Sequence, residues 1–158
     1  PGSAAVWHSP LQRCELLALD LQALRPDLIS QPDTRLREMD FGEWEGQTWD
    51  AIGKTAIDAW TDAFHTHAPG GGESLHAMLA RVGQALQAAR QQHAGSGVQD
   101  VVWITHAGVA RCVHWLLAQG TGVTPQPDTW PVHAPAWGGW VIHSLGAATP
   151  VGGSSARY

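Results

Sequence analysis

The spacing of apolar residues changes from that of a strand to that of a helix between residues 101 and 117. Residues 101–105 are apolar or β-branched without a break, which predicts a strand buried on both faces of a parallel sheet. His106 ends this strand. The apolar positions that follow recur at the spacing of one helix face, and they are Val109, Cys112, Val113, Leu116 and Leu117. We therefore predict a strand followed directly by a helix, with His106 at the junction.

Strand and helix patterns alternate over the rest of the chain. Residues 6–8 predict a short strand, and Ser9 and Pro10 predict the N-cap and first residue of a helix that ends at Arg25 and Pro26. The apolar face of that helix holds Leu11, Cys14, Leu17, Ala18, Leu21 and Leu24. Between the first helix and the central strand, we predict a polar connector at 31–35, a loop at 36–46 over the sheet edge, a helix at 50–64, a loop at 65–72 and a helix from 73 that ends in the glycines at 95–97. After the central helix, we predict an irregular segment at 120–138, a strand at 139–145 and a frayed tail at 147–158. This alternation predicts one α/β layer sandwich, with residues 1–158 in a single domain.

Composition and charge argue against several classes of protein. Hydrophobic residues make up 44% of the chain without an apolar run of about 18 residues or more, so it resembles neither a disordered chain nor a membrane span. Nine Lys and Arg against fourteen Asp and Glu give a formal charge of −5 with no basic block, which argues against nucleic acid as a partner. We find no pattern of a secretion signal, and we expect Cys14 and Cys112 to be buried free thiols, so the expected location is the reducing cytoplasm.

Two side chains are predicted to face a bound anion. His106 lies at the carboxyl end of a strand and at the start of a helix, where open α/β sheets bind ligands. Arg13 lies in the first turn of a helix, where the helix dipole disfavours a cation unless an anion is held between the two. A structural histidine and a solvated arginine remain the alternatives for these residues.

Glu38 and Glu43 are candidate general acids. They lie in the segment LREMDFGEWEG at 36–46, where acidic and aromatic residues are mixed. A carboxylate pressed against aromatic rings has a raised pKa and can donate a proton near neutral pH, although either residue taken alone fits a solvated surface acid. His65 and His67 in the next loop could contact a ligand or only water, and an i, i+2 pair without further ligands is a poor metal site.

Tryptophan is unusually common, with nine copies. We expect most of them to pack in the core or to cover its edges. Stacked platforms for sugars or bases are the alternative, and they would make the protein a Trp-rich binding module.

Four motifs occur in order along the chain: WHSPLQRC, LREMDFGEWEG, PGGGES and ITHAG. Together they resemble the histidine phosphatase superfamily, also called phosphoglycerate mutase-like. Within this superfamily, the sequences of the FGEWEG and GGGES motifs are most similar to those of the cobalamin-pathway α-ribazole phosphatases and the broad-specificity phosphatases. The resemblance covers nearly all of residues 6–145. It implies a three-layer α/β/α sandwich that hydrolyses a small phosphorylated metabolite through a phosphohistidine, with no cofactor and no metal ion.

The resemblance also implies roles for single residues. His106 matches the second histidine of the family, which contacts the phosphoryl group as it transfers, and Glu38 matches the acid that protonates the leaving oxygen. Ser9 and Arg13 match the motif that holds the phosphate. The phosphate-binding set, in which Glu73 lies beside the pocket, is Ser9, Arg13, Glu73 and Ala107. We expect the loop at 64–72 and the segment at 120–138 to shape the substrate pocket.

The sequence departs from the family at its defining motif. Family members begin with a strand that ends in Arg-His-Gly, whose histidine is the nucleophile, and this sequence contains no Arg-His-Gly. That strand lies beside the one that ends in the second histidine, so we expect residues 101–105 to have an unpaired edge. Three explanations stay open: the front of the protein is supplied elsewhere, the edge pairs with another copy or another strand, or His8 substitutes as the nucleophile.

Two further functions stay open beside hydrolysis. The chain could bind a phospho-ligand without turnover, as an inactive remnant, or act as a phosphoglycerate mutase-like phosphotransferase. A mutase pocket has to exclude water, and the sequence does not reveal such a pocket. An exposed sheet edge would favour self-association, and a homodimer is one alternative for an oligomeric state that the sequence leaves open.

Overall fold

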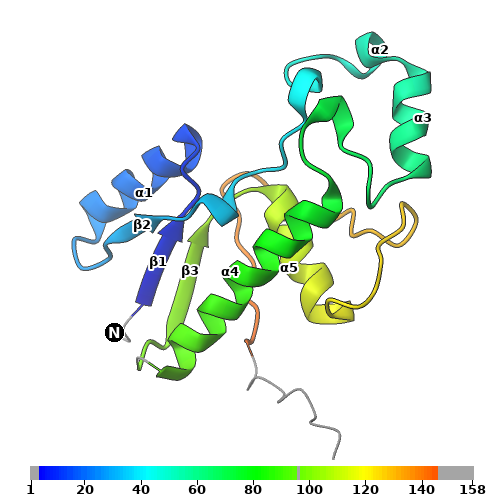
Figure 1. Ribbon diagram of the computed structural model, residues 1–158. Coiled ribbons are helices and arrows are strands. Elements are labelled where there is room, and N and C mark those ends of the chain that lie inside the picture. Colours follow the sequence, from blue (N-terminus) through cyan, green and yellow to red (C-terminus); the bar gives the residue numbers. More distant parts are fainter. Residues whose placement is uncertain (1–3, 96, 146–158) are drawn as a thin grey trace, which may run out of the picture.

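The centre of the molecule is a parallel sheet (Figure 1). The computed structural model describes residues 4–95 and 97–145, and within them the sheet has three strands. β1 (Ala4–His8) is the middle strand, with β2 (Ser30–Pro32) on one side and β3 (Asp100–Ile104) on the other. His8 pairs with Pro32 and with Ile104, so the carboxyl ends of all three strands meet at one edge of the sheet.

Helices cover both faces of this sheet. α1 (Gln12–Leu24) lies against one face, while α4 (Leu75–Gly95) and α5 (Ala107–Gln119) lie on the other (Figure 1). The core beneath α1 consists of Val6, Cys14, Ala18 and Ile104. The larger core, beside α4 and α5, is built from Leu36, Met39, Leu75, Met78, Leu79, Val82, Ala85, Val109, Cys112, Val113 and Trp115. The layered α/β sandwich that the sequence predicts is therefore confirmed, and both predicted thiols, Cys14 and Cys112, are free and buried.

Two short helices form a separate lobe beside the sheet (Figure 1). α2 (Trp49–Ile52) is capped by the hydroxyl of Thr48, and α3 (Lys54–Asp62) follows it directly. The single helix predicted at 50–64 is thus divided at Gly53, whose φ of +83° breaks the helical path. The connecting segments contain the short 3₁₀ turns Thr34–Leu36, Gly42–Trp44 and Pro69–Gly71.

The start of α1 differs from the prediction. Leu11, not Ser9, occupies the N-cap position, and the helix begins at Gln12. The buried Ser9 hydroxyl instead contacts Nε2 of His106 at 2.7 Å and accepts the backbone N–H of Leu11, which precedes the helix, at 3.3 Å. The predicted apolar face is also narrower than expected, because Leu17 and Leu24 are exposed and only Cys14 and Ala18 are buried.

Two strand predictions were wrong in part. β3 is an edge strand of the described sheet, so of its residues only Ile104 is buried, and the expected burial on both faces is not found. Residues 139–145 form no strand, and Trp140 and Ile142 are more than four-fifths exposed. A strand needs a partner for its backbone groups, and none of the described strands pairs with this segment. The polar connector predicted at 31–35 instead supplies β2, while the predicted tail at 147–158 lies outside the described residues.

Most of the described tryptophans pack against other rings or the core. Trp60 is surrounded by the rings of Phe41, Trp44, Trp49 and Phe64, whose centroids lie 5.9–6.3 Å from its own. Trp115 is buried and packs against Trp130 at 5.7 Å. Trp137 and Trp140, in contrast, are largely exposed. The helices in the described part of the chain are too short or too polar to cross a bilayer.

Candidate functional site

The candidate site lies where β1 and β3 end. Ser9 follows β1 and His106 follows β3 after Thr105, and the backbone N–H of Ser9 donates to the carbonyl of Ile104 at 2.9 Å. This bond holds the two strand ends together. Both side chains are buried, and His106 occupies the N-cap position of α5. The point in the sequence where the apolar spacing changes from that of a strand to that of a helix, at His106, is therefore the turn that carries the candidate site.

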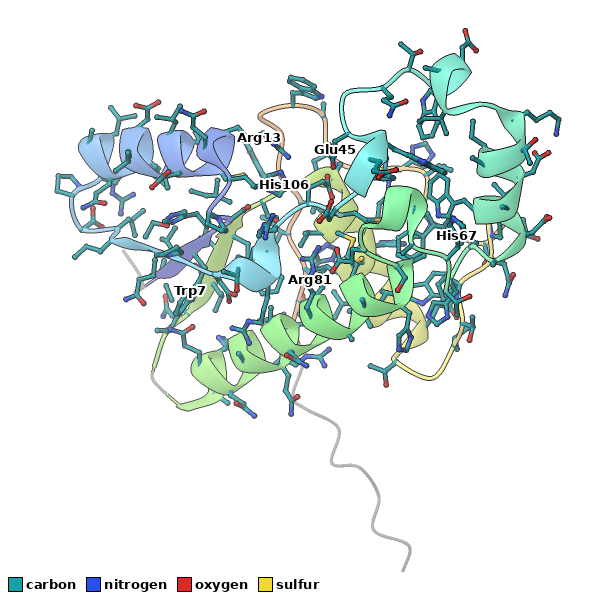
Figure 2. The ribbon with its side chains drawn as sticks, turned by 45° about the horizontal axis from the view of Figure 1, so that its top comes forward. Trp7, Arg13, Glu45, His67, Arg81 and His106 are labelled. Atoms are coloured by element: carbon teal, nitrogen blue, oxygen red, sulfur yellow. The ribbon has the colours of Figure 1, made fainter. Side chains whose placement is uncertain are left out.

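His106 is bonded through both of its ring nitrogens. The Nε of Arg13 donates to Nδ1 of His106 at 3.1 Å, and Nε2 lies 2.7 Å from the hydroxyl of Ser9 (Figure 2). A guanidinium has no acceptor, so Nδ1 must be the accepting nitrogen and Nε2–H the donor to Ser9. Burial, and then the positive charge of Arg13, lower the pKa of His106 below its usual value. The imidazole is therefore neutral at neutral pH.

Cys14 lies against the same imidazole. Its Sγ is 3.5 Å from Nε2 of His106 and 3.6 Å from the carbonyl oxygen of Thr105. Burial raises the pKa of the Cys14 thiol, and burial raises the pKa of Cys112 to about 12. Neither thiol is therefore a ready nucleophile.

Glu38 lies at the N-terminus of α5. Its Oε2 accepts the backbone N–H of Gly108 at 3.2 Å, and its Oε1 accepts the N–H of Met39 at 3.1 Å. A β-carbon at Gly108 would collide with the carboxylate, so the close approach depends on glycine at this position. The structure thus brings Glu38 to the end of α5 where His106 occupies the N-cap position. Glu43 is exposed on the Gly42–Trp44 turn, and within the described residues its carboxylate forms no hydrogen bond or ion pair.

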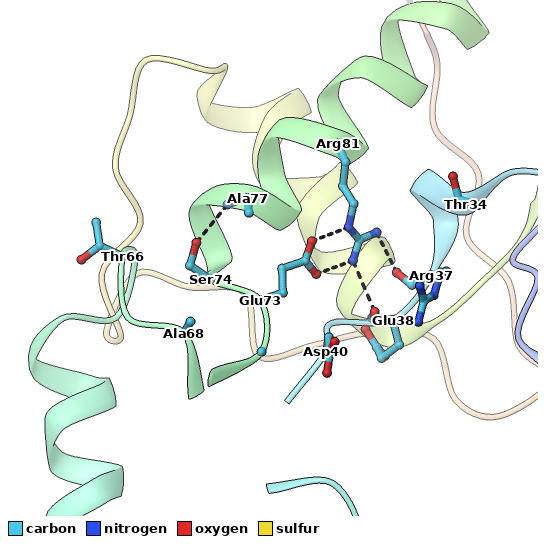
Figure 3. Close-up of a pocket in the computed structure, with 11 residues that line it drawn as sticks. Thr34, Arg37, Glu38, Asp40, Thr66, Ala68, Glu73, Ser74, Ala77 and Arg81 are labelled. Atoms are coloured by element: carbon cyan, nitrogen blue, oxygen red, sulfur yellow. Dashed lines mark hydrogen bonds and ion pairs between the residues drawn. The ribbon is translucent and has the colours of Figure 1, made fainter. Parts of the chain in front are cut away.

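Arg81 fixes the segment that carries Glu38. Its guanidinium pairs with both carboxylate oxygens of Glu73 at 2.6 and 2.7 Å, and it also donates to the backbone carbonyls of Arg35, Arg37 and Glu38 (Figure 3). Both side chains of the pair are about four-fifths buried. Glu73 therefore acts as an anchor beside the pocket. The sequence reasoning missed Arg81, although an acid and an arginine about two helical turns apart were a usable signal.

A pocket adjoins this cluster on the side of Glu38 and has a volume of about 480 Å³ (Figure 3). Its walls carry the polar side chains of Thr34, Arg37, Asp40, Thr66 and Ser74, together with Glu38, Glu73 and Arg81. Arg13, Ser9 and His106 do not line it. The candidate site thus has two parts, a group of side chains predicted to bind an anion and a polar pocket, and Glu38 lies between them. Of the two segments predicted to shape the pocket, 64–72 contributes to its walls and 120–138 does not.

Of the remaining predicted residues, Ala107 lies at the candidate site, whereas His8 and His67 do not contact Arg13 or His106. Ala107 begins α5, is exposed, and presents an N–H that no group among the described residues accepts, so a bound anion can use it. His8 is buried and its Nδ1 is 2.6 Å from the hydroxyl of Ser30 on β2. His67 lies far from Arg13 and His106 (Figure 2). Across residues 4–95 and 97–145, no group of three or more His, Cys, Asp or Glu side chains could hold a metal ion.

Comparisons with known proteins agree with this geometry. Residues 2–131 match the family model described as histidine phosphatase superfamily (branch 1). A metal-independent phosphoserine phosphatase of Arabidopsis thaliana is 29% identical over 123 residues, which are 74% of this chain and 50% of that protein. A mycobacterial glucosyl-3-phosphoglycerate phosphatase, solved with inorganic phosphate, is 32% identical with a TM-score of 0.56, over 72% of this chain and 57% of its own.

A more distant neighbour extends the comparison of folds. The α-ribazole phosphatase of Shigella flexneri superposes with a TM-score of 0.59 at 24% identity, over 74% of this chain and 58% of its own. At this identity the likeness shows the fold alone, which is the phosphoglycerate mutase-like fold expected from the motifs. The chain spans about half the length of the curated relatives that it matches.

Proposed function

Because this chain belongs to branch 1 of the histidine phosphatase superfamily, we propose that it forms the phosphate-binding and acid part of a phosphomonoesterase. One observation carries the proposal: Arg13, His106 and Glu38 come together at the N-terminus of α5 from three distant parts of the chain. Two of them are suited to hold phosphate oxygens and the third is suited to donate a proton.

The phosphoryl group is placed between the guanidinium of Arg13, the imidazole of His106 and the N–H of Ala107. The positive end of the α5 dipole adds to the field of Arg13, and both stabilise the charge on the equatorial oxygens during transfer. Glu38 donates its proton to the leaving oxygen, and the leaving alcohol departs into the pocket that Glu38 lines. A histidine attacks phosphorus in this reaction, and water then releases phosphate from the phosphohistidine.

We propose that the attacking histidine comes from outside the described residues. The outer edge of β3 pairs with no strand among the described residues, and it ends beside His106, so an added parallel strand would deliver its last residues to the site. The length of the curated relatives, about twice the matched segment, supports a further segment of the same protein as the source. A second copy of the chain in a homodimer is the other source. His8 is a weaker candidate because Ser30 already engages its ring.

The substrate proposed is a small phosphorylated metabolite. The pocket beside Glu38 is polar and has a volume of about 480 Å³, which suits a small polar alcohol. The specific candidate is α-ribazole 5′-phosphate, and the sequences of the FGEWEG and GGGES motifs support it. This substrate would give the protein a role in cobalamin biosynthesis. The free buried thiols Cys14 and Cys112 support a cytoplasmic location.

A second candidate function is binding of a phospho-ligand without turnover. The observation that favours it is that the described residues bring together the side chains proposed to bind phosphate and the acid Glu38, without the Arg-His-Gly nucleophile motif. A mutase-like phosphotransferase is a further alternative, supported by a phosphoglycerate mutase-like relative from Arabidopsis thaliana that is 32% identical over 114 residues.

The test is hydrolysis of p-nitrophenyl phosphate by the 158-residue chain. The variants are His106→Ala and Glu38→Gln, and Glu43→Gln is the matched control because Glu43 is an exposed acid of the same segment. Turnover by this chain that is lost in the first two variants and kept in the control supports the proposed site, with the nucleophile supplied by a second copy or by His8. Folded protein that binds inorganic phosphate through Arg13 without turnover agrees with a nucleophile from a further segment. It supports the binding alternative if a longer form of the protein that includes that segment also fails to turn over. Folded protein with neither property overturns both.

A further inference from the structure

Two histidines form a contact outside the phosphate site. His65 lies in the turn after α3, and His76 lies in the first turn of α4. Nε2 of His65 is 3.3 Å from Nδ1 of His76, and the two rings are nearly perpendicular with their centroids 4.9 Å apart. The backbone N–H of His76 also donates to the carbonyl oxygen of His65 at 2.9 Å, which fixes the distance between the two residues.

The distance between the nitrogens allows two explanations. In the first, one neutral imidazole donates an N–H to the other, but 3.3 Å is longer than the usual 2.9–3.0 Å of such a bond. In the second, both nitrogens offer lone pairs to one ion. Two nitrogens at about 2.0–2.1 Å from a tetrahedral metal lie about 3.3–3.4 Å apart. The observed separation fits this second arrangement.

We propose that His65 and His76 form a two-histidine site for a divalent transition metal such as Zn²⁺. Imidazole nitrogens suit zinc, copper and nickel, and the ligands have to be neutral in order to bind. His76 is exposed and His65 is half-buried, so an ion can reach both nitrogens from solvent. No third His, Cys, Asp or Glu among the described residues completes the set, so water fills the remaining positions.

The metal site would join the two walls of the substrate pocket. Thr66 follows His65 and Ala77 follows His76, and both of these neighbours line the pocket beside Glu38. A bound ion would therefore tie the loop after α3 to the first turn of α4. This role is structural, and it is separate from the phosphate held by Arg13 and His106.

The test is to titrate the 158-residue chain with Zn²⁺ in phosphate-free buffer and to measure the binding by isothermal titration calorimetry. Replacement of either ligand, in His65→Gln or His76→Gln, is expected to weaken binding by about tenfold or more. His67→Gln is the control within the same loop. His114→Gln is the control for a histidine with a histidine neighbour, since the charge of His114 acts on His143.

Nuclear magnetic resonance of ¹⁵N-labelled imidazoles gives a readout on the unmodified protein. Zn²⁺ is expected to shift Nε2 of His65 and Nδ1 of His76 and to raise the melting temperature of the parent chain but not of His76→Gln. Shifts at other histidines, or equal binding by the parent and both ligand variants, would overturn the proposal. These measurements do not involve the phosphate site, so they would stay valid if the proposed phosphatase function proved wrong.

Discussion

The guanidinium of Arg13 donates from Nε to Nδ1 of His106 across 3.1 Å, although the two residues are 93 positions apart in the chain. This bond decides which imidazole nitrogen carries the proton, and it places a permanent positive charge beside a neutral ring. The pair is thus prepared for an anion, because a bound phosphate would draw Arg13 toward itself and favour protonation of His106.

Stability should depend on pH through His106. Its pKa in the folded protein lies below the usual 6.5, so as the pH falls through 6.5 the unfolded chain takes up the proton first. Stability attributable to this residue is therefore complete above pH 6.5, declines below it, and stops declining below the lowered pKa. Urea unfolding at a series of pH values from 8 to 5 should show a smaller decline for His106→Gln than for the parent chain. Equal declines in both proteins would contradict the assignment of a neutral His106.

Glycine to alanine changes in two helices should have opposite effects. At Gly83 in α4 a β-carbon would contact only Cδ1 of Leu116 at 3.8 Å, so Gly83→Ala should raise the free energy of unfolding by about 0.5–1 kcal/mol. At Gly108 the β-carbon would displace the Glu38 carboxylate, which is the end of a flexible side chain, and would break its hydrogen bond to the Gly108 N–H. Gly108→Ala should therefore lower the free energy of unfolding by about 0.5–1.5 kcal/mol. Urea denaturation measures both. A gain at Gly108 similar to that at Gly83 would show that Glu38 does not sit where the structure places it.

The turns at 40–46 and 69–73 depend on Gly70. Gly70 and Gly71 both have positive φ, at 60° and 73°, but a β-carbon at Gly70 would strike the carbonyl of Phe41 whereas one at Gly71 meets open space. Gly71→Ala should lose only the backbone strain of about 1–2 kcal/mol. Gly70→Ala should lose about 1–3 kcal/mol more through the collision. Thermal or urea unfolding of the two variants compares them directly, and equal losses would count against the close contact of the two turns.

Removal of Arg81 should destabilise the protein strongly. It leaves the largely buried Glu73 carboxylate and three backbone carbonyls without their donor, and a buried pair broken on one side costs about 3 kcal/mol or more. Arg81→Met should show this loss in urea unfolding, and Glu73→Gln in the same protein should recover part of it. Arg25→Met is the control, because the exposed pair of Arg25 with Asp27 should contribute little. Similar effects at both arginines would refute the anchoring role of Arg81.

The parts of the fold that could be predicted are those with local signals. The change from an apolar run to a helical period marks β3 and α5 on either side of His106, and Thr48 marks the start of α2. The candidate site residues were predicted from motifs that occur in order, and the structure brings Arg13, Ser9, His106 and Glu38 together; their roles stay a prediction.

The parts that could not be predicted depend on tertiary contacts. β2 consists of Ser, Gln and Pro and has no apolar signal, so only the neighbouring edge of β1 makes it a strand. Ser9 is a residue type that often caps helices, yet its hydroxyl contacts His106 at 2.7 Å and accepts the N–H of Leu11, and the helix begins only at Gln12. Residues 139–145 have a strand composition but pair with no strand among the described residues, and composition alone cannot supply the missing hydrogen bonds.

The outer edge of β3 also has a consequence for handling the protein. Residues 101–104 are uncharged and β-branched or aromatic, which is the composition that promotes amyloid-like stacking, and Asp100 at the start of the strand is the one charged residue of β3. Concentrated solutions of the chain alone should therefore precipitate through edge-to-edge association of strands. A lysine in place of Val102, whose side chain is 37% exposed, would act as a gatekeeper against such precipitation.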